Sequence, residues 1–289
     1  MSKKKTDVPV LSQSLLADGI YDMWIETDLA DSARPGQFLG VYPANKVTLL
    51  PRPISICEVD RERHALRLVY RVVGSGTAEF ALYQRGDYIS VIGALGNGFP
   101  LEKAAGKRVC LMGGGIGIPP LLGLSKELSA QQGAGGLSQK LQMPEGATST
   151  LNSKPAALTA PKSITSVLGY RDDDTFLSAE FDSFSGVVIA TEDGSVGTKG
   201  NVIGAVKENG IEADVIFACG PMPMLRAIKA YAQEKGIKAY LSLEERMACG
   251  VGACLGCVCK TTVKDSHSHV NNARICTDGP VFDAEDLDI

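Results

Sequence analysis

The sequence predicts an N-terminal antiparallel β-barrel, a doubly wound parallel α/β domain and a small C-terminal domain built around cysteines. Three observations support this prediction. Short β-type runs alternate with polar turns in residues 1–102, strands alternate with helices in residues 103–241, and a dense cysteine run falls in residues 242–289. These three ranges are the predicted domains.

Composition narrows the classes of function before any motif is considered. The chain has 289 residues, of which 44% are hydrophobic, so packed cores are expected. A formal net charge of −4 offers no basic surface for nucleic acid. No apolar stretch is long enough to span a bilayer and the N-terminus lacks the hydrophobic region of a signal peptide, so we expect no membrane contact and a cytoplasmic location.

The predicted barrel strands are short and regularly spaced, at residues 37–42, 54–59, 65–73 and 88–92. The tetrapeptide Arg52-Pro53-Ile54-Ser55 opens the second of them. Its arginine offers a planar fork for a pyrophosphate, the proline stiffens the strand entry, and the serine hydroxyl can hydrogen-bond a flavin ring nitrogen. Taken alone, the tetrapeptide is read more simply as a surface arginine before a strand.

A glycine-rich turn at residues 74–77 is the second phosphate signal. It leads into a predicted helix over residues 78–83, with Thr77 as the N-cap. Free N–H groups and the dipole at a helix N-terminus both favour phosphate oxygens. The alternative interpretations are an ordinary capped turn and, for the preceding Tyr70, a position in the core.

The α/β domain begins with a predicted strand at residues 108–112, a glycine-rich turn at 113–120 and a helix over 121–128. Glycines in such a turn permit close approach of the backbone to a dinucleotide pyrophosphate at the helix start. The pattern departs from GxGxxG because Pro120 stands where the third glycine is expected. The candidate dinucleotide contacts in this turn are Gly113, Gly114, Gly115, Gly117 and Pro119.

Further predicted strands lie at residues 164–169, 187–191, 214–218 and 239–243. Cys219, Gly220 and Pro221 follow one of these strands at its carboxyl end, where α/β sheets bind ligands, so we expect them beside the nicotinamide. A tight strand-to-helix turn is a compatible alternative. Arg171 suits a 2′-phosphate, but the acidic run 172–174 would repel it, which favours NAD over NADP.

Residues 131–163 are rich in Gly, Ala, Ser, Thr and Pro and show no periodicity. Such a composition buries too little apolar surface to offset the entropy of ordering the chain. We therefore predict a mobile surface insertion within the α/β domain, without a chemical role.

The cysteines carry the most specific pattern in the chain. Cys249, Cys254 and Cys257 have CxxxxCxxC spacing, and Cys276 follows at a distance, which is typical of a plant-type [2Fe–2S] cluster. Glycines between the ligands allow the loop to turn tightly around the sulfurs. The remaining cysteines Cys57, Cys110 and Cys219 lie in strand-like apolar contexts and read as small buried hydrophobes.

Three alternatives concern this cluster. Cys259 is close to the ligand run, but a pair separated by one residue would strain the loop, so packing is favoured. His267 and His269 suggest a Rieske-type site, but their polar surroundings favour solvated side chains. The four cysteines can also be read as a structural zinc site, although zinc knuckles usually contain a second close pair.

Together these motifs resemble the electron-transfer subunits of NAD-linked (class 1B) dihydroorotate dehydrogenases, a family of the ferredoxin reductase superfamily. The resemblance covers nearly the whole chain except the predicted insertion. It is carried by residues 52–55, 76–77, 113–120, 219–221 and, above all, 243–257 with 276–282.

The resemblance implies that the barrel binds FAD, that the α/β domain binds NAD, and that the C-terminal segment holds a [2Fe–2S] cluster facing a separate FMN-containing catalytic subunit. It also implies a heterotetramer with two copies of each subunit. The residues implied to contact FAD are Arg52, Pro53, Ile54, Ser55, Val69, Tyr70, Arg71, Gly76 and Thr77. Those implied to ligate the cluster are Cys249, Cys254, Cys257 and Cys276.

The implied activity is a relay in pyrimidine biosynthesis. Dihydroorotate would be oxidised on the FMN of the partner, and electrons would pass through the cluster and FAD to NAD+. No catalytic residue that abstracts a proton from dihydroorotate is expected in this chain. Another FAD and [2Fe–2S] NAD(P)H reductase, linked to ferredoxin or sulfide, is the alternative enzyme, although residues 247–249 and 278–282 favour the dihydroorotate system.

Overall fold

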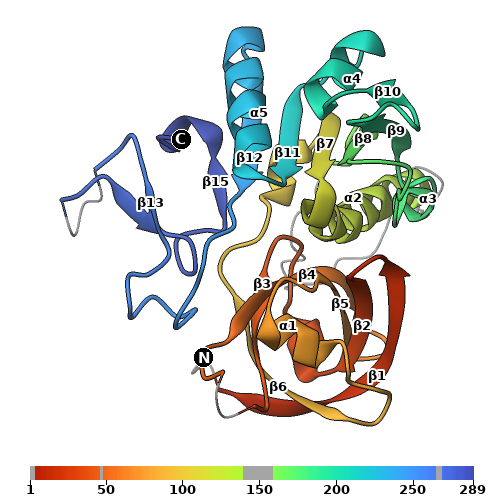
Figure 1. Ribbon diagram of the computed structural model, residues 1–289. Coiled ribbons are helices and arrows are strands. Elements are labelled where there is room, and N and C mark those ends of the chain that lie inside the picture. The colour runs from red at the N-terminus through yellow and green to blue at the C-terminus, as the bar shows by residue number, and fades with distance from the viewer. Residues whose placement is uncertain (1–3, 46–47, 139–158, 265–268) are drawn as a thin grey trace, which may run out of the picture.

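The computed structural model describes residues 4–45, 48–138, 159–264 and 269–289. They form a barrel, an α/β domain above it and a C-terminal lobe beside both (Figure 1). The predicted fold class is confirmed. Among the described residues, no helix combines the length and the apolar character that crossing a membrane requires.

The barrel is closed, with strand order β1-β2-β5-β4-β3-β6. Closure leaves no unpaired sheet edge. The sequence does not single out β1 and β2, because polar residues interrupt their apolar alternation; Asp22 in β2, for example, is buried and paired with Arg67. The strands are β1 (Thr6–Ala17), β2 (Ile20–Glu26), β3 (Phe38–Tyr42), β4 (Arg52–Asp60), β5 (Ala65–Arg71) and β6 (Tyr88–Leu95).

Short helices η1 (Asp28–Asp31) and α1 (Ser75–Phe80) accompany the barrel, and η2 (Leu101–Ala104) follows it and packs in a hydrophobic cluster with Val109 and Leu111. The prediction that Thr77 is the N-cap of α1 is wrong, because Gly74 occupies that position. Thr77 lies in the first turn, where its hydroxyl oxygen accepts hydrogen bonds from the N–H groups of Val73 at 2.9 Å and Gly74 at 3.3 Å. The hydroxyl thus satisfies backbone donors that precede the helix.

The α/β domain contains a seven-stranded sheet with order β10-β9-β8-β7-β11-β12-β15. All neighbours pair in parallel except β12 and β15. Its strands are β7 (Arg108–Gly114), β8 (Ser163–Tyr170), β9 (Gly186–Thr191), β10 (Thr198–Lys199), β11 (Val215–Cys219), β12 (Lys238–Ser242) and β15 (Val281–Asp283). Its helices are η3 (Gly115–Gly117), α2 (Pro119–Ser138), α3 (Ser178–Phe181), α4 (Val202–Glu208) and α5 (Met222–Lys235).

Helix α2 is longer than the predicted helix over residues 121–128 and enters the segment 131–163 that the composition assigns to an insertion. Its Leu121, Leu122, Leu124 and Leu128 are buried and anchor the predicted part of the helix, and the glycines beyond Leu128 do not stop the helix. Of the predicted insertion, residues 139–158 lie outside the described residues.

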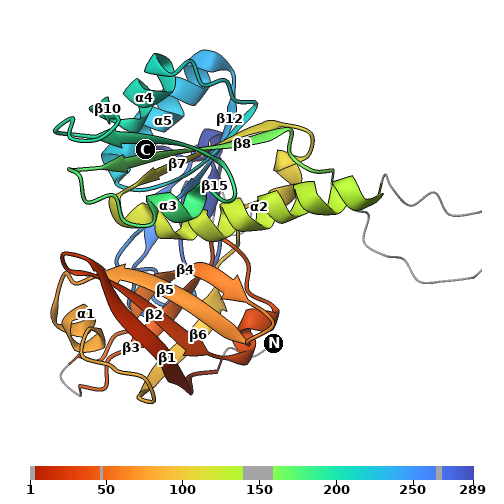
Figure 2. The ribbon, with the colours of Figure 1, turned by 90° about the vertical axis from the view of Figure 1, so that its right-hand side faces the viewer.

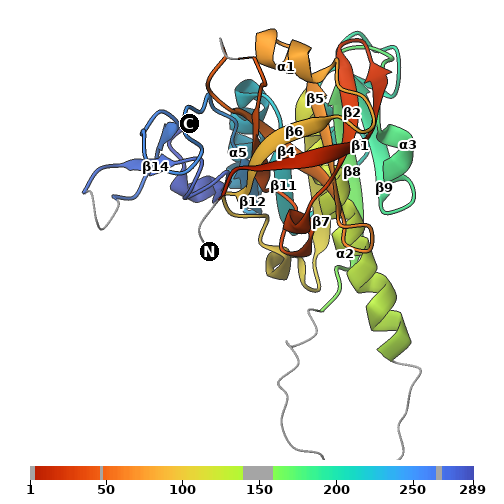
Figure 3. The same cartoon turned by 90° about the horizontal axis from the view of Figure 1, so that it is seen from below.

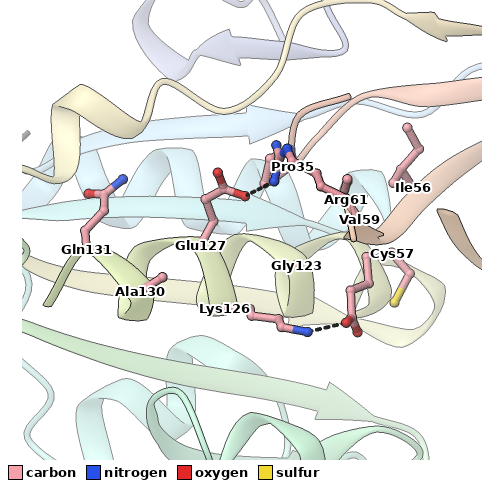
Figure 4. A pocket seen from close by; sticks show the side chains of 11 residues that line it. Pro35, Ile56, Cys57, Val59, Arg61, Gly123, Lys126, Glu127, Ala130 and Gln131 are labelled. Carbon is pink, nitrogen blue, oxygen red and sulfur yellow. Dashed lines mark hydrogen bonds and ion pairs between the residues drawn. The ribbon is translucent and has the colours of Figure 1, made fainter. Parts of the chain in front are cut away.

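Helix α2 also joins the two larger parts of the molecule, since it lies between the barrel and the sheet (Figure 2). A Cβ atom at Gly123 would overlap the carbonyl oxygen of Cys57 on β4. Beside this contact is a cavity of about 400 Å³. In Figure 4, dashed lines join Arg61 to Glu127 and Lys126 to a barrel carboxylate, which is Glu58.

The C-terminal lobe contains β13 (Val258–Lys260) and β14 (Asn272–Arg274), which pair antiparallel, and ends with η4 (Ala284–Asp286). Strand β15 leaves the lobe to pair with β12, with Ser242 opposite Val281. The sequence does not indicate this short strand. Seen from below, the lobe projects to one side of the barrel (Figure 3).

Candidate functional site

A groove of about 760 Å³ lies where the barrel, the α/β domain and the C-terminal lobe meet. Residues from all three parts line it, including Gly117 and Cys219 from the α/β domain and Glu244 and Pro280 from the C-terminal segment. The barrel contributes Arg52, Pro53, Ile54, Ser55, Val69, Tyr70, Arg71 and Thr77.

Arg52 lies against the first turn of α1. A Cβ atom added to Gly76 would lie 2.7 Å from Arg52 Nε, so glycine is what lets the guanidinium approach the helix. The Nη1 atom of Arg52 donates a hydrogen bond to the carbonyl oxygen of Leu50 at 2.6 Å. A guanidinium over a helix N-terminus is a cradle suited to a pyrophosphate, and this geometry fits the predicted flavin dinucleotide.

Tyr70 is buried in the core, as one interpretation predicts, and also lines the groove. Only 3% of its surface is exposed, and its ring stacks on Tyr21 with centroids 5.9 Å apart. The hydroxyl donates a hydrogen bond to Gln13 Oε1 at 2.9 Å. Burial raises the pKa of Tyr70, so the phenol stays neutral.

The two predicted nucleotide loops lie side by side because β7 and β11 are neighbours in the sheet, with Gly113 opposite Cys219. A Cβ atom at Gly117 would overlap the carbonyl of Cys219, and one at Gly114 would lie 2.5 Å from Met224 Sδ. These glycines are therefore required by contacts within the protein. Among the four glycines of the loop at residues 113–117, Gly115, with φ +52°, is the one that has open space around it.

The other residues of the predicted NAD set belong to the same loops without lining the groove. Gly220 packs against Met224, Pro119 begins α2 and Pro221 is the N-cap of α5. Arg171 follows β8 and is exposed, and Asp172 closes the next turn by accepting a hydrogen bond from Asp174 N at 3.1 Å. Of the predicted NAD contacts, Gly117 and Cys219 therefore line the groove together with the residues predicted to contact FAD.

The groove also contains residues that sequence reasoning missed, at positions 242–247. Glu244 is among them, and burial together with the charge of Glu245 raises its pKa. Burial also raises the pKa of Cys219 to about 12, partly offset by a hydrogen bond with Ser242. The sequence signal that could have identified residues 242–247 was their position, since they lead directly into the cysteine run.

The four predicted ligand cysteines come together in the C-terminal lobe. Gly252 lies between Cys249 and Cys254 and donates a hydrogen bond from its N–H to Cys276 Sγ, and Ile275 N donates to the carbonyl oxygen of Cys257 at 2.9 Å. The cysteine loop and the segment of Cys276 are therefore in contact, as a [2Fe–2S] group held by both would require. Within the described part of the chain, no three His, Cys, Asp or Glu side chains converge as one metal ion would need.

Backbone N–H groups surround the sulfurs. Gly252 N donates to Cys276 Sγ at 3.2 Å, and Val251 N donates to Cys249 Sγ at 3.4 Å. Burial raises the pKa of Cys249, but such donors outweigh it and lower the pKa to about 7. Burial and the neighbouring Cys257 raise the pKa of Cys276 to about 12. The loop therefore already favours negative charge at one ligand.

The competing ligands lie elsewhere. Cys259 lies on β13 opposite Ala273 and packs against the core, and burial raises its pKa. His269 is exposed, whereas His267 falls outside the described residues. Cys57 and Cys110 are buried in strands, as their apolar contexts predict.

Comparisons with known proteins agree with this geometry. Residues 244–288 match the family model of the iron-sulfur cluster binding domain of dihydroorotate dehydrogenase B. The chain is 37% identical over 284 residues to the dihydroorotate dehydrogenase B (NAD(+)) electron transfer subunit of Bacillus mycoides, covering 96% of each chain. It is 40% identical over 282 residues to the subunit of the same name from Bacillus caldolyticus, again covering 96% of each.

Solved structures show the same architecture. A chain of the NADH-dependent reduced ferredoxin-NADP oxidoreductase superimposes with a TM-score of 0.77 at 28% identity, covering 97% of this chain and 89% of that one. The ferredoxin NADP+ reductase from Neisseria gonorrhoeae, with bound FAD and NADP, superimposes with a TM-score of 0.60 at 16% identity, covering 84% and 94%. The second likeness concerns the fold alone.

Proposed function

The chain belongs to the family of electron transfer subunits of dihydroorotate dehydrogenase B (NAD(+)), and we propose that it carries electrons from the catalytic subunit through a [2Fe–2S] cluster and FAD to NAD+. The net reaction converts dihydroorotate and NAD+ into orotate, NADH and a proton. When bound, the cluster exchanges one electron at a time, the flavin one or two, and the nicotinamide two. The observation that carries the proposal is that the segments flanking the four cysteines, residues 242–247 and Pro280, line the same groove as the flavin candidates, while the cysteine loop contacts Cys276.

We assign the flavin to the groove. Arg52 and the first turn of α1, with Gly76 and Thr77, bind the pyrophosphate. Pro53, Ile54 and Ser55, together with Val69, Tyr70 and Arg71, hold the remainder and exclude water from one side of the ring. Each of these residues except Gly76 lines the groove, and Gly76 makes room for Arg52.

We assign the nicotinamide dinucleotide to the adjacent loops. Gly113, Gly114, Gly115, Gly117 and Pro119 would carry the pyrophosphate, and Cys219, Gly220 and Pro221 would hold the nicotinamide against the flavin. The support is that Gly117 and Cys219 face the same groove as Ser55 and Tyr70. Cys219 stays a neutral thiol in this environment, so its role is to position the ring rather than to transfer a proton.

We assign the cluster to Cys249, Cys254, Cys257 and Cys276, and the docking face of the catalytic subunit to the loop around them. Cys254 is exposed and is followed by Leu255, whose surface is 63% exposed; Val251 is 40% exposed. Exposed apolar residues beside an electron-transfer group mark an interaction surface. The partner in this proposal contains FMN, and two copies of each subunit assemble in the cytoplasm, where ligand thiols stay reduced.

Anaerobic purification of this chain together with the catalytic subunit tests the activity. We expect FAD, FMN, iron and acid-labile sulfide in the complex, bleaching of its visible absorption by NADH, and formation of NADH from dihydroorotate and NAD+. One zinc ion without flavin, or no reduction by NADH, would refute the relay. Electron donation by ferredoxin in place of dihydroorotate would favour the other reductase class.

The docking face has its own test. Leu255→Asp should weaken binding of the catalytic subunit about tenfold or more, because a charge is placed in an apolar contact. Leu15→Asp on β1 is the matched control, since Leu15 is 61% exposed and lies on the barrel. Equal binding by both variants would place the partner elsewhere.

A further inference from the structure

The structure assigns to Asn97 a positioning role in the proposed electron transfer: it clamps the segment that joins cluster ligand Cys276 to the flavin groove. This inference rests on the proposed function and extends it to a residue that no motif identifies. Asn97 follows β6 of the barrel and lies at the surface, on the side facing residues 278–281 of the C-terminal segment.

Asn97 makes four hydrogen bonds to that segment. Its backbone N–H donates to the carbonyl of Gly279 at 2.6 Å. Its Nδ2 group donates to the carbonyls of Asp278 at 3.0 Å and Val281 at 2.9 Å, and its Oδ1 accepts from Val281 N at 3.0 Å. Both side-chain amide protons and the amide oxygen are therefore used.

The arrangement specifies an asparagine. Turning the amide over would set its oxygen against two carbonyl oxygens and its NH₂ against the N–H of Val281. An aspartate would keep the acceptor and lose both donors. The barrel side is fixed in turn, since Gln37 Nε2 donates to the carbonyl of Gly96 at 2.8 Å. A Cβ atom at Gly96 would lie 2.6 Å from both Gly279 O and Pro280 Cδ, so the two backbones are in close contact.

The clamped segment connects the two proposed cofactor sites. Cys276 lies two residues before Asp278, and Pro280 lines the groove. The carbonyl oxygen of Pro280 also accepts a hydrogen bond from Leu243 N at 2.8 Å. A second groove residue, Leu243, is therefore bound to the same segment. A shift of this short segment therefore moves a ligand sulfur relative to the flavin candidates.

A second path leads from the clamp to the cluster loop. Asp278 Oδ2 accepts a hydrogen bond from Arg274 N at 2.8 Å, and Arg274 Nη1 reaches the carbonyl of Gly252 at 3.5 Å. Gly252 N donates to Cys276 Sγ. Because the flavin candidates belong to the barrel and the ligands to the lobe, this contact controls the spacing between the two electron-carrying groups.

The test compares Asn97→Asp with the unmodified chain, both loaded with FAD and cluster. After rapid mixing with NADH, flavin reduction should keep its rate within about twofold, whereas electron transfer from flavin to cluster should slow about tenfold, because its rate falls as the gap between the two groups widens. As a readout independent of turnover, the amide hydrogen of Leu243, which is bonded to Pro280 on the clamped segment, should exchange faster in the variant, and the visible circular dichroism of the cluster should change.

Asn209→Asp is the matched control. Asn209 is exposed, and its Nδ2 donates to the carbonyl of Ala205 at 2.9 Å and to Thr198 Oγ1 at 3.2 Å, far from the groove. The Asn209→Asp variant should lose stability without a change in the rate of flavin reduction or of electron transfer to the cluster. Unchanged transfer to the cluster in Asn97→Asp, or equal slowing of both steps, would refute the positioning role alone. Failure of NADH to reduce the unmodified chain would refute the proposed function, and the inference with it.

Discussion

Arg67 on β5 of the barrel and Glu180 on α3 of the α/β domain form a bidentate ion pair, with distances of 2.6 Å from Nη1 to Oε2 and 2.9 Å from Nη2 to Oε1. The same guanidinium donates to both oxygens of Asp22, at 3.0 and 2.8 Å, and its side chain is only 7% exposed. Burial lowers the pKa of Arg67, but the hydrogen bonds to Glu180 and Asp22 outweigh it and raise the pKa. One buried cation thus joins the proposed flavin and nicotinamide domains.

Replacing this cation should be costly. Arg67→Leu leaves the carboxylates of Asp22 and Glu58 without their buried partner and should lower the free energy of unfolding by about 3–5 kcal/mol. Arg61→Leu is the control, because Arg61 is 46% exposed and pairs with Glu127 at 3.6 Å, so its loss should cost about 0–1 kcal/mol. Urea denaturation followed by fluorescence and circular dichroism measures both, and equal losses would contradict the prediction.

Gly123 should be intolerant of any side chain. Gly123→Ala would place a Cβ atom on the carbonyl of Cys57, force α2 away from β4 and lower stability by about 1–3 kcal/mol. In α4, a Cβ atom at Gly204 would meet only Asn201 Oδ1 at 3.8 Å, so Gly204→Ala should stabilise by up to about 1 kcal/mol. Thermal denaturation of the pair checks the difference in sign; a stabilised Gly123→Ala would show that the domain contact can yield.

The cluster should depend on Cys257 and not on its near neighbour. Cys257→Ser removes a buried predicted ligand and should abolish the iron and acid-labile sulfide content, whereas Cys259→Ser should retain both. Chemical analysis of the two purified variants decides the matter. Loss of iron from Cys259→Ser alone would reassign the ligands.

Stability should fall with rising pH through the buried thiol of Cys110. Burial raises the pKa of Cys110 to about 12 in the folded chain, while the unfolded thiol ionises near the ordinary value of 9.0. The neutral thiol is favoured by folding, so its contribution is complete below pH 9 and is lost as pH rises toward 12. Between pH 8 and 10, the unmodified chain should lose about 1.4 kcal/mol more than Cys110→Ala. Parallel pH profiles of the unfolding free energy would disprove this.

Local patterns predicted the features that depend on local chemistry. Alternation indicated β3 to β6, buried runs alternating with helices indicated the parallel sheet, and cysteine spacing singled out four cysteines that lie in one lobe. Strand β15 was not predictable, because three residues that pair with a distant edge carry no periodicity. Thr77 was wrongly predicted as the N-cap, because a threonine hydroxyl can accept hydrogen bonds either as the cap or from within the first turn, where it accepts from the N–H groups of Val73 and Gly74.

The groove shows the same limit. Arg52 and Ser55 are visible in a tetrapeptide, whereas the contacts of Asn97 join segments remote in sequence and leave no motif. The glycines at 114 and 117 were predicted for a cofactor, yet their neighbours in the structure are Met224 and Cys219. A residue type can thus be required by a partner that only the fold brings near.

The antiparallel pairing of Ser242 with Val281 has a consequence for the architecture of the whole chain. The peptide leaves the sheet at β12 and returns beside its point of departure, so residues 243–280 are topologically the connection of a β-hairpin. A tight turn can close the same hairpin. The cysteine-bearing lobe is therefore an insertion at a single sheet edge of a two-domain framework, and its contacts with Asn97 and its share of the groove wall are what couple the insertion to that framework.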